Sequence, residues 1–236
     1  MTSILVALFL VCAVFVQTAP AVSQSAYPVA VSSATNAEGF VAGGWLLEHR
    51  INNDLNADGL NDLVLIVRQT REQVGTDGKS FDVMRRLILI AFMDKQSGRY
   101  RLVQQENAFI PVRETVNVED YLSGYNPLKP IPGGFSVDLE LFMSAGGWEM
   151  ELRTFQFEYR NGQFVLVNFD SQRTHRSSGE TTGIKVDYLT GLVVKNSGNA
   201  QDDEIREASE NLAVPRLFNL EDIGPGFDFI PVPAKD

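Results

Sequence analysis

The sequence predicts a mainly β protein built from antiparallel hairpins. Apolar residues either alternate with polar ones or form short β-branched runs, and turn pairs that contain glycine separate these runs. The clearest turn pair is Asn161-Gly162, which is typical of a two-residue hairpin turn. We therefore expect a twisted antiparallel sheet, a sandwich or a partial propeller of hairpins, with a short C-terminal helix.

The chain begins with a segment typical of a secretory signal peptide. Residues Ile4 to Val16 form an uncharged apolar run, which is too short to span a bilayer core about 30 Å thick. Small residues follow, and we expect cleavage between Ala21 and Ala26, so residues 1–26 are assigned to the signal peptide. The first three residues carry no Lys or Arg, and an uncleaved N-terminal anchor is the alternative. Cleavage would leave a secreted or periplasmic protein with no stable membrane span.

Residues 27–42 are rich in Ala, Ser and Val, and we expect them to form a flexible lead-in. Residues 43–236 are expected to form a single β-rich domain, because this length suffices for one sizeable core.

Several segments have clear strand patterns. Residues 86–93 are apolar at nearly every position, as in a strand that is covered on both faces. Residues 135–143 alternate, as in a half-buried strand. Trp148, Met150 and Leu152 alternate in one phase and residues 155–159 in the opposite phase, so we expect a β-bulge or bend near Thr154.

The turn at Asn161-Gly162 leads into a strand over residues 164–169. Residues 181–188 and 192–195, joined by Thr190-Gly191, are expected to form a further hairpin.

The remaining segments are irregular or helical in pattern. Residues 111–134 contain four prolines and two adjacent glycines, which favours a long loop with a short helix around Val118–Leu122. The acidic, Ala-rich stretch Asp202–Leu212 is the best helix candidate. The tail after Pro215 is irregular, and its aromatic residues indicate that it packs onto the domain.

Composition excludes several kinds of site. The chain has 30 acidic and 20 basic residues, a formal net charge of −10, which disfavours nucleic acid and anionic membrane surfaces as partners. Its one cysteine, Cys12, lies in the expected signal peptide. A cleaved chain would therefore have no disulfide, thiolate metal site or cysteine nucleophile.

One stretch of the chain has explicit ligand chemistry. Residues 54–62 place oxygen-bearing side chains at loop positions 1, 3, 5 and 9, a glycine at position 6 and a free carbonyl at position 7. Calcium prefers six to eight such oxygens, and glycine relieves the tight turn that aims them inward. The expected calcium ligands are Asp54, Asn56, Asp58, Leu60 (through its carbonyl) and Asp62. The alternative is an acidic turn without metal, because Asn, Asp and Gly are good turn residues.

The residues after the loop separate this site from an EF-hand. Position 12 is Leu65 instead of an acid, and the apolar run of residues 63–67 indicates a strand instead of a helix. The loop resembles the D-x-[DN]-x-D-G-x-x-D loops of integrin α-chain FG-GAP repeats and bacterial VCBS repeats, and the resemblance covers residues 45–68. It implies calcium that staples a hairpin in a non-catalytic, interaction-type domain. Loops in those families recur, whereas this chain has one.

An internal similarity accompanies this loop. Residues 43–50 and 146–153 share the frame G-G-W-x-x-E-x-R, and a turn pair follows eight residues after each arginine. A duplicated hairpin in which only the first copy kept its calcium ligands explains this, and chance similarity between two amphipathic hairpins is the alternative.

Catalytic patterns are weak. Neither His49 nor His175 lies in a known catalytic motif, and both are expected to be packed or solvated. A hydrolase would need two carboxylates across a cleft, and the strands offer Glu140, Glu149, Glu151 and Glu158. An aromatic patch of Phe142, Trp148 and Tyr159 would suit a carbohydrate or protein surface.

We therefore expect a secreted or periplasmic, non-catalytic, calcium-stabilised β domain that serves as an interaction or structural protein of the cell envelope. Its partner would be a protein or glycan that the sequence does not identify. A glycan- or protein-binding module with an aromatic surface and a carboxylate-dependent hydrolase are the alternatives.

Overall fold

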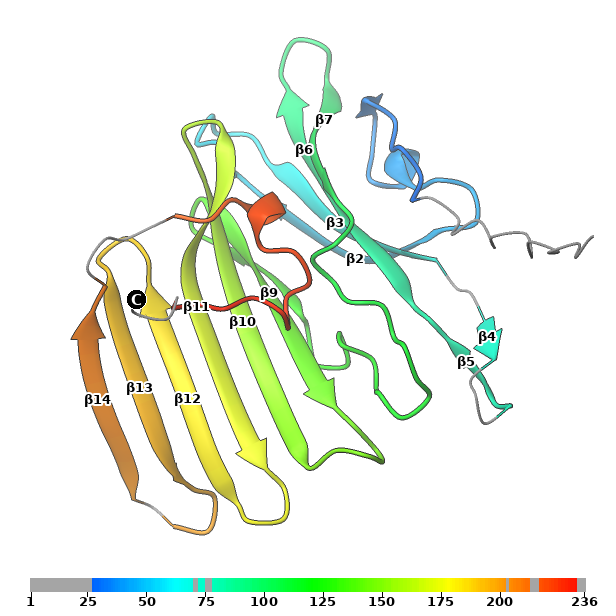
Figure 1. Cartoon of the computed structure of the whole chain (residues 1–236). Helices are drawn as coiled ribbons and strands as arrows, with labels where there is room; N and C mark the ends of the chain where they lie inside the picture. Colours follow the sequence, from blue (N-terminus) through cyan, green and yellow to red (C-terminus); the bar gives the residue numbers. More distant parts are fainter. Residues whose placement is uncertain (1–26, 70–71, 75–77, 203, 213–216, 233–236) are drawn as a thin grey trace, which may run out of the picture.

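Two antiparallel sheets make up most of the molecule (Figure 1). The computed structural model describes residues 27–69, 72–74, 78–202, 204–212 and 217–232, so the expected signal peptide lies outside the described part. Within these ranges, no helix has the length and apolar character needed to cross a membrane. The expectation of a mainly β, antiparallel fold is confirmed.

The first sheet has five strands in the order β1-β7-β6-β3-β2. Its members are β1 (Ser33–Ala34), β2 (Leu46–Asn53), β3 (Asp62–Gln69), β6 (Arg85–Asp94) and β7 (Arg99–Glu106). A separate two-stranded ribbon, β4 (Glu72–Val74) and β5 (Ser80–Asp82), is inserted between β3 and β6. Strand β6 is buried over most of its length, as its continuous apolar run predicted.

The second sheet has seven strands, which run in reverse chain order from β14 to β8. Its members are β8 (Leu128–Ile131), β9 (Gly134–Phe142), β10 (Glu149–Arg160), β11 (Gln163–His175), β12 (Glu180–Asp187), β13 (Leu192–Asn199) and β14 (Ile205–Asn211). The predicted hairpin turn joins β10 to β11, and both Asn161 and Gly162 have the positive φ angles that such a turn requires. The hairpin predicted around Thr190-Gly191 joins β12 to β13.

Two helix predictions are wrong. Residues 202–212 contain strand β14, which pairs with β13 from Leu192↔Asn211 to Gly198↔Ile205. This edge strand is exposed on both faces, so it lacks the alternation that marks a half-buried strand, and backbone bonds to β13 override its local helical preference. The expected helix at Val118–Leu122 is a loop in which Glu119 N–H donates to Phe142 O, at 2.9 Å. The only helical turns in the described residues are the 3-10 turns η1 (Glu38–Phe40) and η2 (Leu220–Asp222).

The phase change expected near Thr154 does not occur. A bulge or irregularity does lie close by, between Gln156 and Phe157 in the pairing of β10 with β11, whereas β10 pairs with β9 without a register shift. The same face of β10 is buried from Glu151 and Arg153 to Phe155 and Phe157, so two charged residues occupy positions on the core side.

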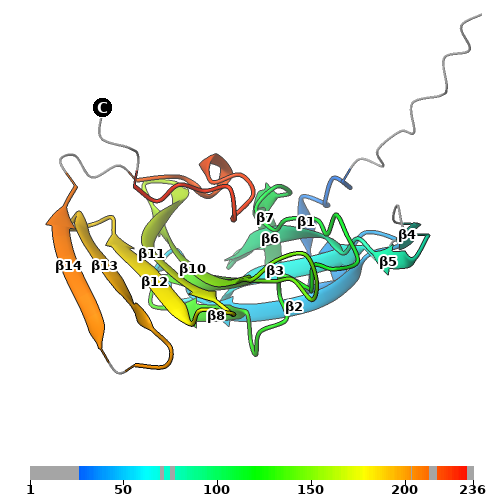
Figure 2. The same ribbon diagram turned by 60° about the horizontal axis from the view of Figure 1, so that its bottom comes forward.

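The larger core lies between the two sheets and beneath the C-terminal tail, residues 217–232. We call the core-facing side of the seven-stranded sheet its inner face. Aromatic rings from β10, β11 and the tail pack edge to face there, with Phe155 and Phe169 centroids 5.0 Å apart and Phe169 and Phe229 centroids 5.6 Å apart. Figure 2 shows that the tail crosses one face of the sheet only.

The second face of the five-stranded sheet is covered by the segment that the sequence marks as a lead-in. Ala34, Ala37, Phe40 and Trp45 are buried there against β3 and β6. Residues 27–42 therefore help to make β6 a strand that is covered on both faces.

Candidate functional site

The predicted calcium loop connects β2 to β3 and lies where the two sheets meet. The Asn53 side-chain amide donates to Ile131 O at 2.7 Å and to Gly134 O at 2.8 Å, both in the turn between β8 and β9. The side chain of Leu55 is buried in the larger core. The loop is thus anchored to both sheets.

Short-range hydrogen bonds define the shape of the loop. The Asp54 carboxylate accepts from Gly59 N–H at 2.9 Å and from Asp58 N–H at 3.2 Å. The Asp58 carboxylate accepts from Leu60 N–H at 2.8 Å. Gly59 has a φ of 84°, a left-handed conformation that glycine adopts at little cost, and this supports the role expected for it.

Asp62 is the most constrained residue of the loop because it is fully buried. Its carboxylate accepts from Leu55 N–H at 3.0 Å and from Met93 N–H, near the end of β6, at 2.9 Å. Burial raises the pKa of Asp62, the two backbone hydrogen bonds oppose that rise, and the nearby charges of Asp58 and Asp54 add to it. The three carboxylates therefore repel one another.

The donor set suits a hard cation in its chemistry. In the described residues, Asp54, Asp58 and Asp62 form no ion pair, so no cationic side chain there competes for them. The loop carboxylates bind backbone amides instead of converging, and no group of three or more His, Cys, Asp or Glu side chains in the described ranges is arranged to hold a metal. A carboxylate oxygen that accepts one hydrogen bond keeps a second lone pair, so these bonds are compatible with ligation.

Neither histidine is placed for catalysis. Burial lowers the pKa of His49, which lies on β2 beside a buried ion-pair network. His175 Nδ1 lies 3.0 Å from Ser178 Oγ, but both residues belong to the same exposed turn. Glu180 contacts the serine, at 3.3 Å, and a catalytic triad instead requires an acid that orients the histidine.

The four strand glutamates do not form a carboxylate pair. Glu140 accepts from Ser123 Oγ at 2.8 Å, and Glu158 pairs with Arg160 at 2.7 Å. Glu149 is exposed, and Glu151 alone is buried. Two acids facing each other across one cleft, as a glycosidase needs, are not found among these residues.

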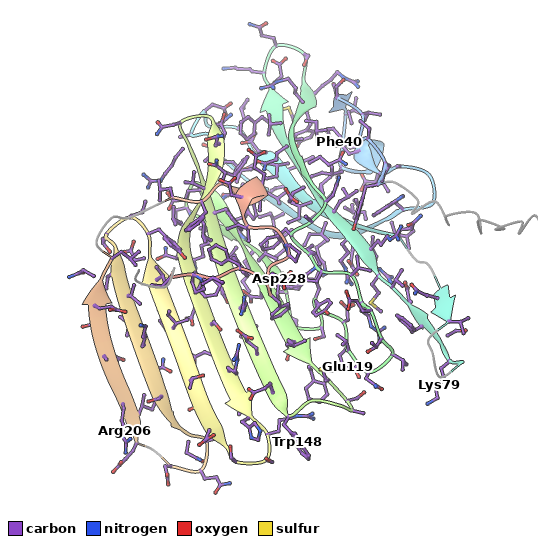
Figure 3. The ribbon with its side chains drawn as sticks, viewed as in Figure 1. Phe40, Lys79, Glu119, Trp148, Arg206 and Asp228 are labelled. Atoms are coloured by element: carbon purple, nitrogen blue, oxygen red, sulfur yellow. The ribbon has the colours of Figure 1, made fainter. Side chains whose placement is uncertain are left out.

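The expected aromatic patch does not assemble. The Arg176 guanidinium lies over Phe142, 4.7 Å from its centroid, and 6.0 Å from the Trp148 centroid. Tyr159 instead packs against Phe92 in the larger core, with centroids 4.9 Å apart. Figure 3 shows Trp148 at the lower ends of the strands, away from the tail residue Asp228.

A charged cluster on the inner face was missed by the sequence analysis. The buried Glu151 carboxylate accepts from Arg153 Nε at 2.7 Å, Ser171 Oγ at 2.8 Å and Arg173 Nη2 at 3.1 Å. Burial favours the neutral acid, but these hydrogen bonds and the arginine charges outweigh it and hold the pKa of Glu151 below its usual range. The signal was present in the two-residue spacing that links Glu151 and Arg153 to Phe155, because it places all three on one strand face.

A pocket of about 420 Å³ opens beside this cluster. Side chains from four adjacent strands and the tail surround it. Its lining residues are Glu151, Arg153, Phe169, Ser171, Arg173, Thr182, Gly183, Ile184, Lys195, Asn196 and Pro231.

A second buried network ties the five-stranded sheet to the long loop before β8. Arg86 is fully buried and donates to Glu48 through Nε, at 2.6 Å, and to Asp120 through Nη2, at 2.7 Å. Arg68 pairs with the same glutamate at 3.1 Å. Since Arg68 and Arg86 lie on β3 and β6, Glu48 on β2 and Asp120 in the loop, the network joins these four segments.

Comparison of the chain with protein-family models, with curated proteins and with solved structures gives no match.

Proposed function

We propose that this protein is a non-catalytic, calcium-stabilised β domain of a secreted or periplasmic protein, which serves as an interaction or structural component of the cell envelope. The observation that carries the proposal is the position of the loop 54–62. It places Asp54, Asp58 and Asp62 in one short loop where the two sheets meet, and none of the three forms an ion pair within the described part of the chain.

This position explains why a cation would stabilise the whole domain. Asp62 is bonded to Met93 N–H at the end of β6, and Asn53 to the turn between β8 and β9. Bound calcium would supply positive charge to the carboxylates of Asp54, Asp58 and Asp62, with Asn56 and the Leu60 carbonyl completing the protein ligands. Because these ligands form only in the folded chain, binding would raise stability by mass action.

Thermal unfolding tests this proposal. We expect the melting temperature to be higher in millimolar calcium than in chelator, with a stabilisation of about 2.7 kcal/mol when free calcium is a hundredfold above its dissociation constant. Asp58→Ala should abolish this difference.

The matched control is Asp94→Ala. Asp94 is an exposed turn acid of the neighbouring hairpin that accepts from Gln96 N–H, so its loss removes a similar turn bond but should leave the calcium response intact. A melting temperature that is equal in chelator and calcium would refute the proposal, as would a calcium response that survives Asp58→Ala.

A binding module is the second candidate function. The pocket on the inner face favours it, because pockets of this volume accommodate small ligands. A binding surface made of Phe142, Trp148 and Tyr159 is less well supported, since Tyr159 lies in the core while Trp148 is exposed just before the start of β10.

A further inference from the structure

The C-terminal tail covers only part of the inner face of the seven-stranded sheet. In Figure 1 the tail crosses the upper part of β9, β10 and β11. No segment covers the lower ends of these strands on this side. The pocket beside Glu151 lies where this cover ends, because Pro231 of the tail forms part of its wall. Tyr188 Oη donates to Pro231 O at 2.8 Å and holds that wall in place.

One side of the pocket is apolar. Phe169 from β11, Ile184 from β12 and Pro231 from the tail line it. Phe169 is buried in the larger core and Ile184 packs against that core, so this apolar surface is firmly supported.

The other side carries an excess of positive charge. Three basic residues (Arg153, Arg173 and Lys195) and one acidic residue (Glu151) line the pocket. The Arg173 side chain is 50% exposed and uses Nη2 for Glu151, and that of Lys195 is 54% exposed and reaches Glu210 at 2.6 Å. Each therefore keeps further N–H donors for a ligand.

The two exposed cations stand on opposite sides of the pocket. Arg173 pairs with Thr182, and Thr182 pairs with Ser197, which is two residues from Lys195 on the same face. Two strand spacings across the sheet and two residues along it give a separation of about 12 Å between the two backbone positions. Arg173 turns toward Glu151 on β10 and Lys195 toward Glu210 on β14, and a carboxylate between them would draw both long side chains inward.

We propose that this pocket binds a small organic carboxylate that has an apolar body. The carboxylate lies between Arg173 and Lys195, and the apolar body lies against Phe169, Ile184 and Pro231. A positive pocket on a chain with a net charge of −10 marks a local preference for anions that the whole molecule does not share.

Isothermal titration of the full domain with 2-naphthoate and with octanoate tests the proposal. We expect one-to-one binding of at least one acid. The acid that binds with the higher affinity shows whether the site prefers an aromatic or an aliphatic body. The amines of matching shape, 2-naphthylmethylamine and octylamine, should bind at least about tenfold more weakly, because their charge has the wrong sign.

Variants separate this site from nonspecific binding. Arg173→Gln and Lys195→Gln should each weaken binding about tenfold, the usual effect of losing a charge-assisted hydrogen bond. Thr182→Trp should block the pocket without removing charge. Lys185→Gln is the control, because Lys185 lies on the opposite face of β12, where it pairs with Asp170 at 3.2 Å, and this change should leave affinity unaltered.

Both cationic side chains are half exposed, so these substitutions should preserve the fold, and an unchanged far-ultraviolet circular dichroism spectrum verifies this. The proposal fails if neither acid binds, if the amines bind as tightly as the acids, or if affinity is the same in Arg173→Gln and Lys195→Gln as in the parent.

Discussion

At the residue scale, a partly buried and a fully buried acid on these strands are each matched to arginines. Glu48 and Glu151 occupy equivalent positions in the two G-G-W-x-x-E-x-R segments, and each is bonded to two arginines. Other positions of the two segments differ in environment, since Trp45 is buried and Trp148 is 63% exposed. The two similar segments therefore share an arginine-bound acid at the same position, while their tryptophans differ in burial.

Acid stability should depend on Glu151. Its pKa in the folded protein lies below its usual range, so its stabilising effect is present above the ordinary pKa of glutamate and is lost as pH falls through the folded pKa. We expect Glu151→Gln to lower the free energy of unfolding at pH 7 by about 1.5–3 kcal/mol, since charged hydrogen bonds are weakened. We also expect the variant to lose less stability than the parent between pH 7 and pH 3, as measured by urea unfolding.

Glu207→Gln on β14 is the control for this experiment. Glu207 is exposed on the edge strand, and its substitution should leave the pH dependence of the parent unchanged. An equal loss of stability on acidification in Glu151→Gln and the parent would contradict the role assigned to Glu151.

At the element scale, an arginine of β10 helps to hold down the C-terminal tail. Arg153 Nη1 donates to Gly226 O at 2.9 Å and to Phe229 O at 3.0 Å, and its guanidinium lies 5.3 Å from the Phe227 centroid. An added Cβ at Gly226 would lie 2.4 Å from Leu139 Cδ1, so a larger residue there would force this buried leucine to shift. The tail is irregular apart from an isolated bridge to β11, and side-chain bonds to its carbonyls and aromatic packing help to fix it.

Replacing this arginine should release the tail. Arg153→Met keeps much of the side-chain volume but removes the donors and leaves Glu151 with less compensation, so we expect a loss of about 3–5 kcal/mol in the free energy of unfolding. Hydrogen exchange should quicken over residues 217–232 more than over the strands.

Arg160→Met provides the comparison. Arg160 forms a more exposed pair with Glu158 on the same strand, and its loss should cost less than about 1 kcal/mol. Unchanged exchange of the tail in Arg153→Met would show that its other contacts suffice to hold it, and would contradict the role given to Arg153.

At the scale of the whole molecule, the two sheets depend on one core. Ile88 and Ile90 of the five-stranded sheet belong to the same buried cluster as Phe155 and Phe169 of the seven-stranded sheet. Neither sheet can lose these contacts without exposing the apolar face of the other, so we expect them to unfold together.

Trp45 can report on this cooperativity, because it packs against the five-stranded sheet. The other tryptophan, Trp148, precedes β10 of the seven-stranded sheet and is removed so that the fluorescence comes from Trp45 alone. In a Trp148→Phe variant, urea unfolding followed by Trp45 fluorescence should coincide with unfolding followed by circular dichroism. Adding Phe155→Ala should shift both curves equally, with a cost of about 3–5 kcal/mol. Separate midpoints for the two signals would mean that the sheets are independent units.

The sequence by itself determined the fold class, most strands and the shape of the loop 54–62. Alternation, continuous apolar runs and the Asn161-Gly162 turn are local signals, and local signals suffice where a strand has one clear buried face or two. The spacing of Asp54, Asn56, Asp58 and Asp62 marked the calcium candidate for the same reason, since turn chemistry depends on adjacent residues.

Only the tertiary structure decided the state of β14, the burial of Glu151 and Arg153, and the pocket beside them. Strand β14 is exposed on both faces, and its identity comes from pairing with β13. Glu151 and Arg153 looked like solvated residues, because their burial depends on Ser171, Arg173 and a tail more than 70 residues away in the chain. The two-residue spacing places both residues on the face of Phe155, but it does not show which distant segments cover that face. The candidate calcium loop could therefore be predicted from the residues, while the candidate ligand pocket could not.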